Sequence, residues 1–166
     1  MRVFLDANIL FSAAKSDGAV RLLVDLLLEA GHECCVDGYV VEEARRNLAV
    51  KAPGGAPALE SLLGRLHQSD IQHADRALEA TLPLPAKDQP VLAAAIRHGC
   101  GALVTGDRSH FGALYGKTFS GVKVHSPRSL AAEVLSGPAV RAPAAKYKLR
   151  RRRKKPRRVP QSAPNP

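Results

Sequence analysis

The stretch VFLDANILFSA, residues 3–13, decides the fold of this chain. Three apolar residues lead directly into Asp6, Asn8 follows two positions later, and the sequence then becomes apolar again. A carboxylate at the end of an apolar strand needs a cation or several hydrogen-bond donors, because burying an unpaired charge is very costly. The stretch contains no lysine, so the cation or the donors that Asp6 needs must come from elsewhere.

Length and composition are those of a globular protein. The chain has 166 residues, 45% of them apolar, and this length favours a single domain. No apolar run reaches the roughly 18 residues that a membrane span requires, and no secretory signal is visible. The three cysteines, Cys34, Cys35 and Cys100, form no C-x-x-C motif and indicate neither a zinc site nor a disulfide framework. We therefore expect a reduced, cytoplasmic protein that does not enter a membrane.

The net charge of +10 is distributed very unevenly. All 15 acidic residues lie at or before Glu133, whereas 11 of the 25 basic residues lie between Arg141 and Arg158. From residue 136 onward the sequence is rich in Pro and Ala and has few large apolar residues, so it cannot bury enough surface to offset the entropy of ordering. We expect a near-neutral folded domain over residues 1–135 and a disordered basic tail over residues 136–166.

The body of the chain alternates strand and helix patterns. Strands are predicted at 2–5, 34–39, 101–105 and 122–126, and residues 71–75 fit either a third strand or an irregular segment. Helices are predicted at 17–31, 40–50 and 58–68, from about Asp88 to Gly99, and at 126–135. This alternation predicts an α/β fold with a parallel sheet covered on both faces.

Several acidic residues are expected at one edge of that sheet. Asp6 and Asp107 directly follow strands, and Asp88 opens a helix that runs antiparallel to the strands. Glu42 or Glu43 lies in the first turns of the helix after the second strand. Because ligands of parallel α/β sheets bind at the carboxyl ends of the strands, four carboxylates are predicted to converge there. Taken singly, Asp88 also fits a helix cap and Asp107 a turn residue.

Converging carboxylates repel one another and need a bound cation. Oxygen ligands without His or Cys favour Mg²⁺ or Mn²⁺ over zinc. Of the two glutamates, Glu42 has Arg45 and Arg46 at ion-pair spacing. Glu43 lies at the border of the apolar face, which favours Glu43 as the ligand.

Four motifs resemble the PIN domain, a small family of metal-dependent nucleases. They are VFLDANILFSA, VVEEARRNL, KDQPVLAAAI and LVTGDRSHFG, and they cover roughly residues 1–135. The resemblance implies a three-layer α/β/α domain in which Asp6, Glu43, Asp88 and Asp107 hold Mg²⁺ or Mn²⁺ and catalyse hydrolysis of single-stranded RNA. Many bacterial members resemble toxins of toxin–antitoxin modules, so the expected partners are RNA, an antitoxin and a second copy of the chain.

One departure from the family concerns the position after the last aspartate. Some members carry another acid about three residues later, where this chain has Ser109 and His110. That difference weakens the expectation of a second metal position. His110 fits either a contact with substrate phosphate or an exposed loop residue, and we favour the loop residue. Asn8 and Thr105 are expected to hydrogen-bond the carboxylates, with ordinary capping or turn bonding as the alternative.

The basic tail is not part of the family pattern. A basic run without acids is either a solvated solubility tail or a nucleic-acid contact, and we favour the contact. The expected contact residues are Arg150, Arg151, Arg152, Arg153, Lys154, Lys155, Arg157 and Arg158.

Two other functions compete with the nuclease. One is a catalytically silent domain that delivers a nucleic-acid-binding tail. The other is a phosphatase of the haloacid dehalogenase type. The phosphatase is disfavoured because such enzymes place a second Asp where this chain has Asn8.

Overall fold

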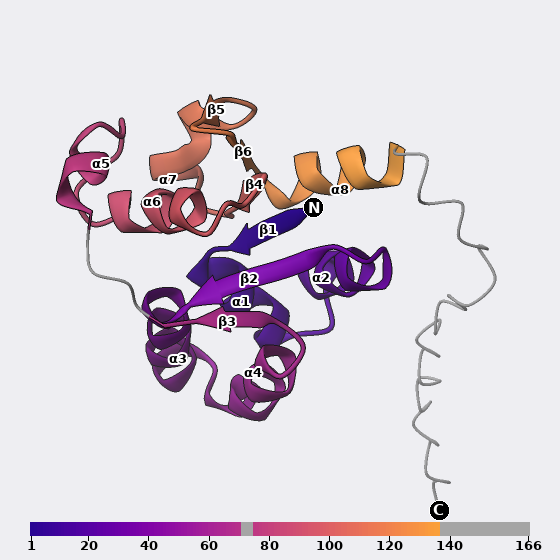
Figure 1. Ribbon diagram of the computed structural model, residues 1–166. Coiled ribbons are helices and arrows are strands. Elements are labelled where there is room, and N and C mark those ends of the chain that lie inside the picture. Colours follow the sequence, from indigo (N-terminus) through magenta and orange to yellow (C-terminus); the bar gives the residue numbers. More distant parts are fainter. Residues whose placement is uncertain (71–74, 137–166) are drawn as a thin grey trace, which may run out of the picture.

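The strands of the computed structural model form one six-stranded sheet in the order β3–β2–β1–β4–β6–β5 (Figure 1). The structure describes residues 1–70 and 75–136. All neighbouring strands are parallel except β5 and β6, which pair in antiparallel fashion. The strands are β1 (Arg2–Leu5), β2 (Glu33–Asp37), β3 (His67–Ser69), β4 (Ala102–Val104), β5 (Thr118–Phe119) and β6 (Val122–His125). The predicted α/β class with a mainly parallel central sheet is therefore confirmed.

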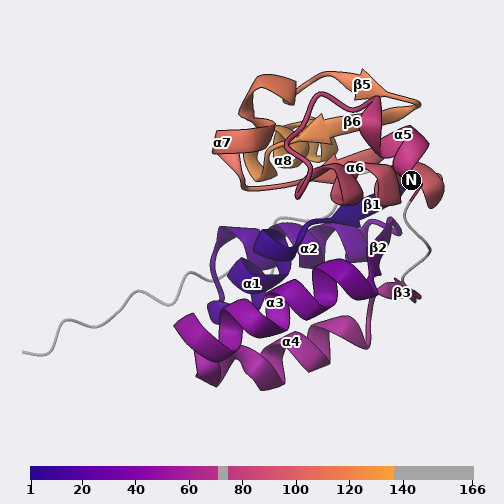
Figure 2. The same cartoon turned by 90° about the vertical axis from the view of Figure 1, so that its left-hand side faces the viewer.

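Helices connect the strands and flank the sheet. They are α1 (Ala7–Lys15), α2 (Ala19–Glu29), α3 (Gly38–Lys51), α4 (Ala56–Leu63), α5 (Arg76–Ala80), α6 (Gln89–Arg97), α7 (Arg108–Phe111) and α8 (Pro127–Ser136), with 3₁₀ turns at Pro53–Gly55 and Gly112–Leu114. Crossovers between parallel strands are right-handed. The path β1–β2–β3 therefore carries α1–α4 on one face, and the return path through β4 to β6 carries α5–α7 on the other. In both views, α1–α4 lie to one side of β1 and the elements from α5 to α8 lie to the other (Figures 1 and 2).

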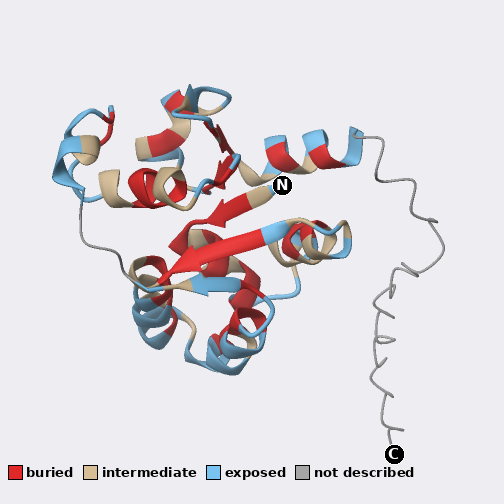
Figure 3. Ribbon diagram, viewed as in Figure 1, coloured by how far each residue is buried: buried red, intermediate tan, exposed pale blue. Residues whose placement is uncertain are grey.

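Strand β1 is the centre of the fold. Val3, Phe4 and Leu5 are completely buried, and Phe4 pairs with Cys35 of β2 on one side and Leu103 of β4 on the other. A strand covered on both faces can be apolar at every position instead of alternating. Figure 3 shows this buried centre, with exposed residues at the margins of the sheet. Asp6 stands at the point where this buried strand ends.

The boundaries of several elements differ from those expected. The helix predicted at 58–68 ends at Leu63, and His67–Ser69 form the short edge strand β3 instead. The sequence continues an apolar spacing through Leu66, but Gly64 caps the helix and the chain turns there. For the segment 71–75, predicted as a third strand or an irregular segment, the structure shows only that Asp75 caps α5, because residues 71–74 lie outside the described part of the chain.

Helices α1, α5 and α7 and strand β5 were not predicted. Helices α5 and α7 and strand β5 are too short to show a periodic pattern, whereas α1 has an apolar face that includes Ile9, Leu10 and Ala13 and was overlooked. The tail predicted to be disordered lies outside the described residues, apart from Ser136 at the end of α8. Within residues 1–70 and 75–136, no helix is both long enough and apolar enough to cross a membrane.

Candidate metal centre

Three aspartates follow three neighbouring parallel strands and cap the helices that come next. Asp6 follows β1 and caps α1, Asp37 ends β2 and caps α3, and Asp107 follows β4 and caps α7. Each carboxylate accepts hydrogen bonds from backbone N–H groups in the first turn of its helix. The carboxyl ends of parallel strands share one edge of the sheet, so the three carboxylates lie along that edge.

Asp6 is buried, with 6% of its surface exposed. One carboxylate oxygen accepts the backbone N–H of Ala7 at 2.6 Å. The other accepts the side-chain amide of Asn8 and the hydroxyl of Thr105, the latter at 2.6 Å. Several donors, supplied by the segments after β1 and β4, therefore surround this carboxylate.

Asn8 and Thr105 extend this contact into a network that links the segments after β1 and β4. The amide oxygen of Asn8 accepts the N–H of Gly106 at 2.7 Å, and the hydroxyl of Thr105 accepts the N–H of Asp107 at 3.1 Å. A Cβ on Gly106 would lie 3.2 Å from the Asn8 amide oxygen, so glycine permits this close approach. The network fixes the backbone of Asp107 relative to Asp6.

The pKa of Asp6 is raised to about 6. Burial is the main cause, because it disfavours the charged form, and the nearby charge of Glu43 adds to it. The hydrogen bonds from Thr105, Ala7 and Asn8 oppose the rise but do not cancel it. Asp6 is therefore an acid whose negative charge the protein alone does not fully compensate.

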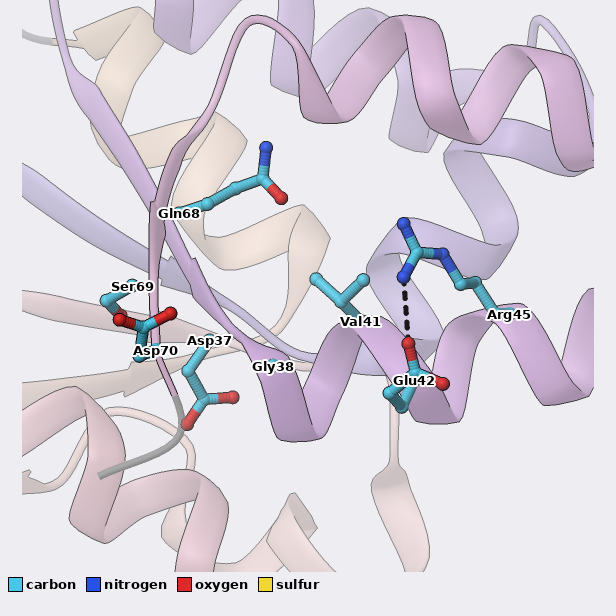
Figure 4. A pocket seen from close by; sticks show the side chains of 8 residues that line it. All are labelled: Asp37, Gly38, Val41, Glu42, Arg45, Gln68, Ser69 and Asp70. Atoms are coloured by element: carbon cyan, nitrogen blue, oxygen red, sulfur yellow. Dashed lines mark hydrogen bonds and ion pairs between the residues drawn. The ribbon is translucent and has the colours of Figure 1, made fainter. Parts of the chain in front are cut away.

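The adjacent glutamates of α3 have different surroundings. Glu42 is exposed and forms an ion pair with Arg45 at 2.8 Å, at the rim of the pocket shown in Figure 4. Glu43 is half-buried and lies close enough to Asp6 to raise its pKa. The pKa of Tyr39 is raised by burial and by the charges of Glu43, Asp88 and Asp6. Glu43 therefore belongs to the group of acids around Tyr39, and Glu42 is engaged elsewhere.

Asp88 precedes α6, but its side chain makes no capping hydrogen bond. Its Oδ2 atom is buried without a hydrogen-bond partner and lies 3.5 Å from Nδ1 of His110. A buried carboxylate oxygen without a donor is costly unless a cation reaches it. Capping therefore does not account for the position of this carboxylate.

Both carboxylate oxygens of Asp107 contact residues of α7. Its Oδ1 accepts the N–H groups of Ser109 and His110 at 2.8 and 3.2 Å, and its Oδ2 lies 2.7 Å from Nδ1 of His110. Burial alone would raise the pKa of Asp107, but the His110 side chain and these N–H groups hold it below the ordinary value. Asp107 therefore stays ionised over a wide pH range.

Asp88, Asp107 and His110 form a group that could hold a metal ion. One ligand atom from each lies within 4.8 Å of the others, and it is the one such group of three or more His, Cys, Asp or Glu residues within the described ranges. Asp6 and Glu43 lie outside this group, although their charges act on each other. The structure thus brings two of the four expected ligands together with a histidine and places the other two next to them.

Asp37 was missed as a site residue, and the interpretation of His110 as an exposed loop residue was wrong, because His110 is half-buried in α7 beside Asp107. His110 lies three residues after Asp107, one turn along a helix, where both side chains face the same way. Asp37 ends a strand in the same way as Asp6 and was overlooked in favour of the glutamates that follow it. It is 4% exposed and lines, with Asp70, the pocket shown in Figure 4. The expected contact residues from Arg150 to Arg158 lie outside the described part of the chain.

Solved structures share this fold. VapBC2 from Rickettsia felis, bound to a DNA fragment from its promoter, matches with a TM-score of 0.57 and 17% identity over 76% of this chain and 98% of that chain. A toxin–antitoxin complex from Klebsiella pneumoniae matches with a TM-score of 0.52 and 18% identity over 72% and 94%. FitAB bound to the IR36 DNA fragment matches with a TM-score of 0.53 and 19% identity over 75% and 94%. At these identities the likeness concerns the fold alone.

A comparison with curated protein sequences gives no match. The sequence model of the PIN domain, in contrast, matches residues 2–109, which include β1, the acidic edge and the start of α7. That span is more than half of the chain and contains Asp6, Glu43, Asp88 and Asp107. The chain therefore belongs to the PIN domain family.

Proposed function

We propose that the protein is a Mg²⁺- or Mn²⁺-dependent endoribonuclease that hydrolyses single-stranded RNA. The observation that carries the proposal is the group of Asp88, Asp107 and His110, whose ligand atoms lie within 4.8 Å of one another at the carboxyl edge of the sheet. Families with PIN domains are generally nucleases that use divalent metals, which agrees with this arrangement.

The residues present fit such an ion. Asp88 Oδ2 is a buried oxygen without a hydrogen-bond donor, so a cation can take the place of the missing partner. Asp107 has a pKa below its ordinary value, so its carboxylate is ionised. Mg²⁺ and Mn²⁺ favour carboxylate ligands, and imidazole suits transition metals. When bound, the ion would lower the pKa of a water molecule and neutralise the charge that builds up on the phosphate.

The remaining acids take different roles in the proposal. Asp6 accepts three hydrogen bonds and holds the Thr105–Gly106–Asp107 loop in place through Asn8 and Thr105. Within the described ranges, Glu43 takes part in no ion pair, whereas Glu42 pairs with Arg45. The carboxylate of Glu43 is therefore the group best able to orient the attacking water and accept its proton.

The biological setting in the proposal is a toxin–antitoxin module. Two of the structural neighbours are a VapBC complex and a toxin–antitoxin complex. By analogy, an antitoxin protein and a second copy of this chain would be partners, and RNA cleavage would take place in the cytoplasm. This analogy rests on fold, and the catalytic proposal does not depend on it.

Cleavage of a labelled single-stranded RNA tests the proposal. We expect hydrolysis in Mg²⁺ or Mn²⁺, no hydrolysis in EDTA, and a loss of several orders of magnitude for Asp107→Asn or Asp88→Asn in folded protein. The competing function, a silent nucleic-acid-binding domain, predicts RNA binding without hydrolysis under every one of these conditions. Activity that survives both substitutions would contradict the metal centre.

A further inference from the structure

A second cavity lies beside Asp107 of the candidate metal centre, on the side of β6. It has a volume of about 470 Å³ and is lined by Gly106, Arg108, Tyr115, Ser126, Pro127 and Arg128. The lining comes from the loop after β4, the start of α7, the segment before β5, and the end of β6 with the start of α8. A cavity of this size is within the range of small-ligand sites.

The cavity shares a wall with the candidate metal centre. The hydroxyl of Tyr115 donates to the carbonyl oxygen of Thr105 at 3.1 Å, and the side chain of Thr105 contacts Asp6. The pKa of Tyr115 is raised by burial and by Asp107 and lowered by Arg108, so both charges lie near its hydroxyl. Arg108 itself follows Asp107 directly in the chain.

The cavity is lined by two basic residues, whereas the adjoining metal centre is built from carboxylates. Arg108 and Arg128 come from two different helices, and both are exposed. Neither forms an ion pair with a carboxylate of residues 1–70 or 75–136. Arg45, Arg65 and Arg2, in contrast, are paired with acids. The guanidinium groups of Arg108 and Arg128 are thus available to an anion that enters the cavity.

Binding of an RNA chain at this site is opposed by electrostatic repulsion. The acids that hold a metal repel the phosphates on either side of the scissile bond, so cationic groups outside the metal centre must supply binding energy. Guanidinium groups suit this purpose because their planar forks match phosphate oxygens. A basic cavity that adjoins the metal centre and presents two arginines meets this requirement.

We infer that the cavity binds a phosphate of single-stranded RNA next to the scissile phosphate, through Arg108 and Arg128. This inference rests on the proposed function, because it names where the same substrate is held. The backbone of a bound strand would therefore run from the metal centre into the cavity along the loop after β4.

Fluorescence anisotropy with a fluorescein-labelled oligouridylate tests the inference. The titrations use the full chain in EDTA, so that binding is measured without hydrolysis and the tail contributes equally to every variant. The Arg108→Ala/Arg128→Ala variant is expected to bind about ten times more weakly than wild type. For each phosphate that is no longer neutralised, the slope of log K against log salt should become shallower by about 0.7. Arg128→Lys should retain part of the affinity, because it keeps the charge but not the fork.

Arg76→Ala is the matched control, since Arg76 is exposed on α5, is not paired with an acid in the described ranges and does not line the cavity. If the double variant binds with the same affinity and salt slope as Arg76→Ala, the inference is wrong. Arginine-dependent binding without any hydrolysis in Mg²⁺ or Mn²⁺ would support the cavity and reject the nuclease. If wild type hydrolyses RNA but the double variant binds RNA as tightly as wild type, the nuclease is supported and the cavity is rejected as a phosphate site.

Discussion

Nδ1 of His110 lies 2.7 Å from Oδ2 of Asp107 and 3.5 Å from Oδ2 of Asp88. One imidazole nitrogen thus stands between two carboxylates that come from different parts of the chain. A metal ion bound here would find one nitrogen and two oxygen ligands. Because imidazole suits transition metals better than Mg²⁺, the identity of this residue should influence which ion is bound.

We expect His110→Gln to weaken Mn²⁺ binding more than Mg²⁺ binding, by several-fold to about tenfold. Glutamine can still hydrogen-bond Asp107 but lacks the imidazole nitrogen, so the variant separates ligation from positioning. Isothermal titration calorimetry with each ion measures the effect, and Asp107→Asn, which should weaken both ions, is the control. Equal losses for the two ions would mean that His110 positions Asp107 and does not bind the metal.

Glu43 and Glu42 offer a second, matched comparison on one helix. We expect Glu43→Gln to reduce RNA hydrolysis by about 10²–10⁴-fold, the usual contribution of a general base. Glu42→Gln should leave hydrolysis nearly unchanged, because Glu42 is exposed and paired with Arg45. The melting temperature of Glu42→Gln should stay close to wild type, since exposed ion pairs contribute little stability. A larger loss of hydrolysis for Glu42→Gln would reverse the assignment.

The sequence was sufficient to predict strands β1, β2, β4 and β6 and to place Asp6 and Asp107 at their carboxyl ends. Val3, Phe4 and Leu5 form an uninterrupted apolar run, which is typical of a strand buried on both faces, and Asp6 marks its end. The order of strands and helices then places Asp88 and Asp107 at the same edge. These predictions depend on the direction of the chain in each element, which the alternating pattern reveals without side-chain detail.

The sequence was less informative where a contact depends on a short element. His110 could be placed beside Asp107 only with knowledge that Arg108–Phe111 is helical, and four residues carry no periodic signal. Strand β3 is an edge strand of three residues, and His67 and Gln68 are exposed, so no apolar pattern identifies it. The partnerless Oδ2 of Asp88 is a property of packing, which no local pattern encodes.

Asp6 should make the stability of the metal-free protein depend on pH. Its pKa is about 6 in the folded protein, compared with 3.8 for an ordinary aspartate. The folded state therefore binds more protons between these values. Stability should fall as pH rises from about 4 to about 6 and then level off, a change on the order of 2–3 kcal/mol. Asp6→Asn is neutral throughout and should lose this dependence.

Thermal unfolding in EDTA across this pH range measures the prediction. The difference in melting temperature, Asp6→Asn minus wild type, should shift in favour of the variant as pH rises. Added Mg²⁺ should raise the melting temperature of wild type more than that of the variant, by mass action on the folded form. Asp17→Asn, at an exposed position, is the control and should follow wild type. If the melting temperatures of Asp6→Asn and wild type change with pH in parallel, the raised pKa of Asp6 is wrong.

The final prediction concerns the basic segment KYKLRRRRKKPRR, residues 146–158, which contains no acid. Phosphate contacts release counterions, so a tail that binds RNA should make affinity fall steeply with salt. Because an arginine run reads no base edges, its contribution should not depend on RNA sequence. Deletion of residues 141–166 should weaken RNA binding and flatten its salt dependence, as measured by anisotropy at several salt concentrations.

The metal requirement for hydrolysis should not change, because Asp6, Glu43, Asp88 and Asp107 precede the deletion. The full chain with Lys and Arg of 146–158 replaced by Gln is the control for length. If both variants bind RNA as wild type does, the segment contacts something other than RNA, such as an acidic protein surface.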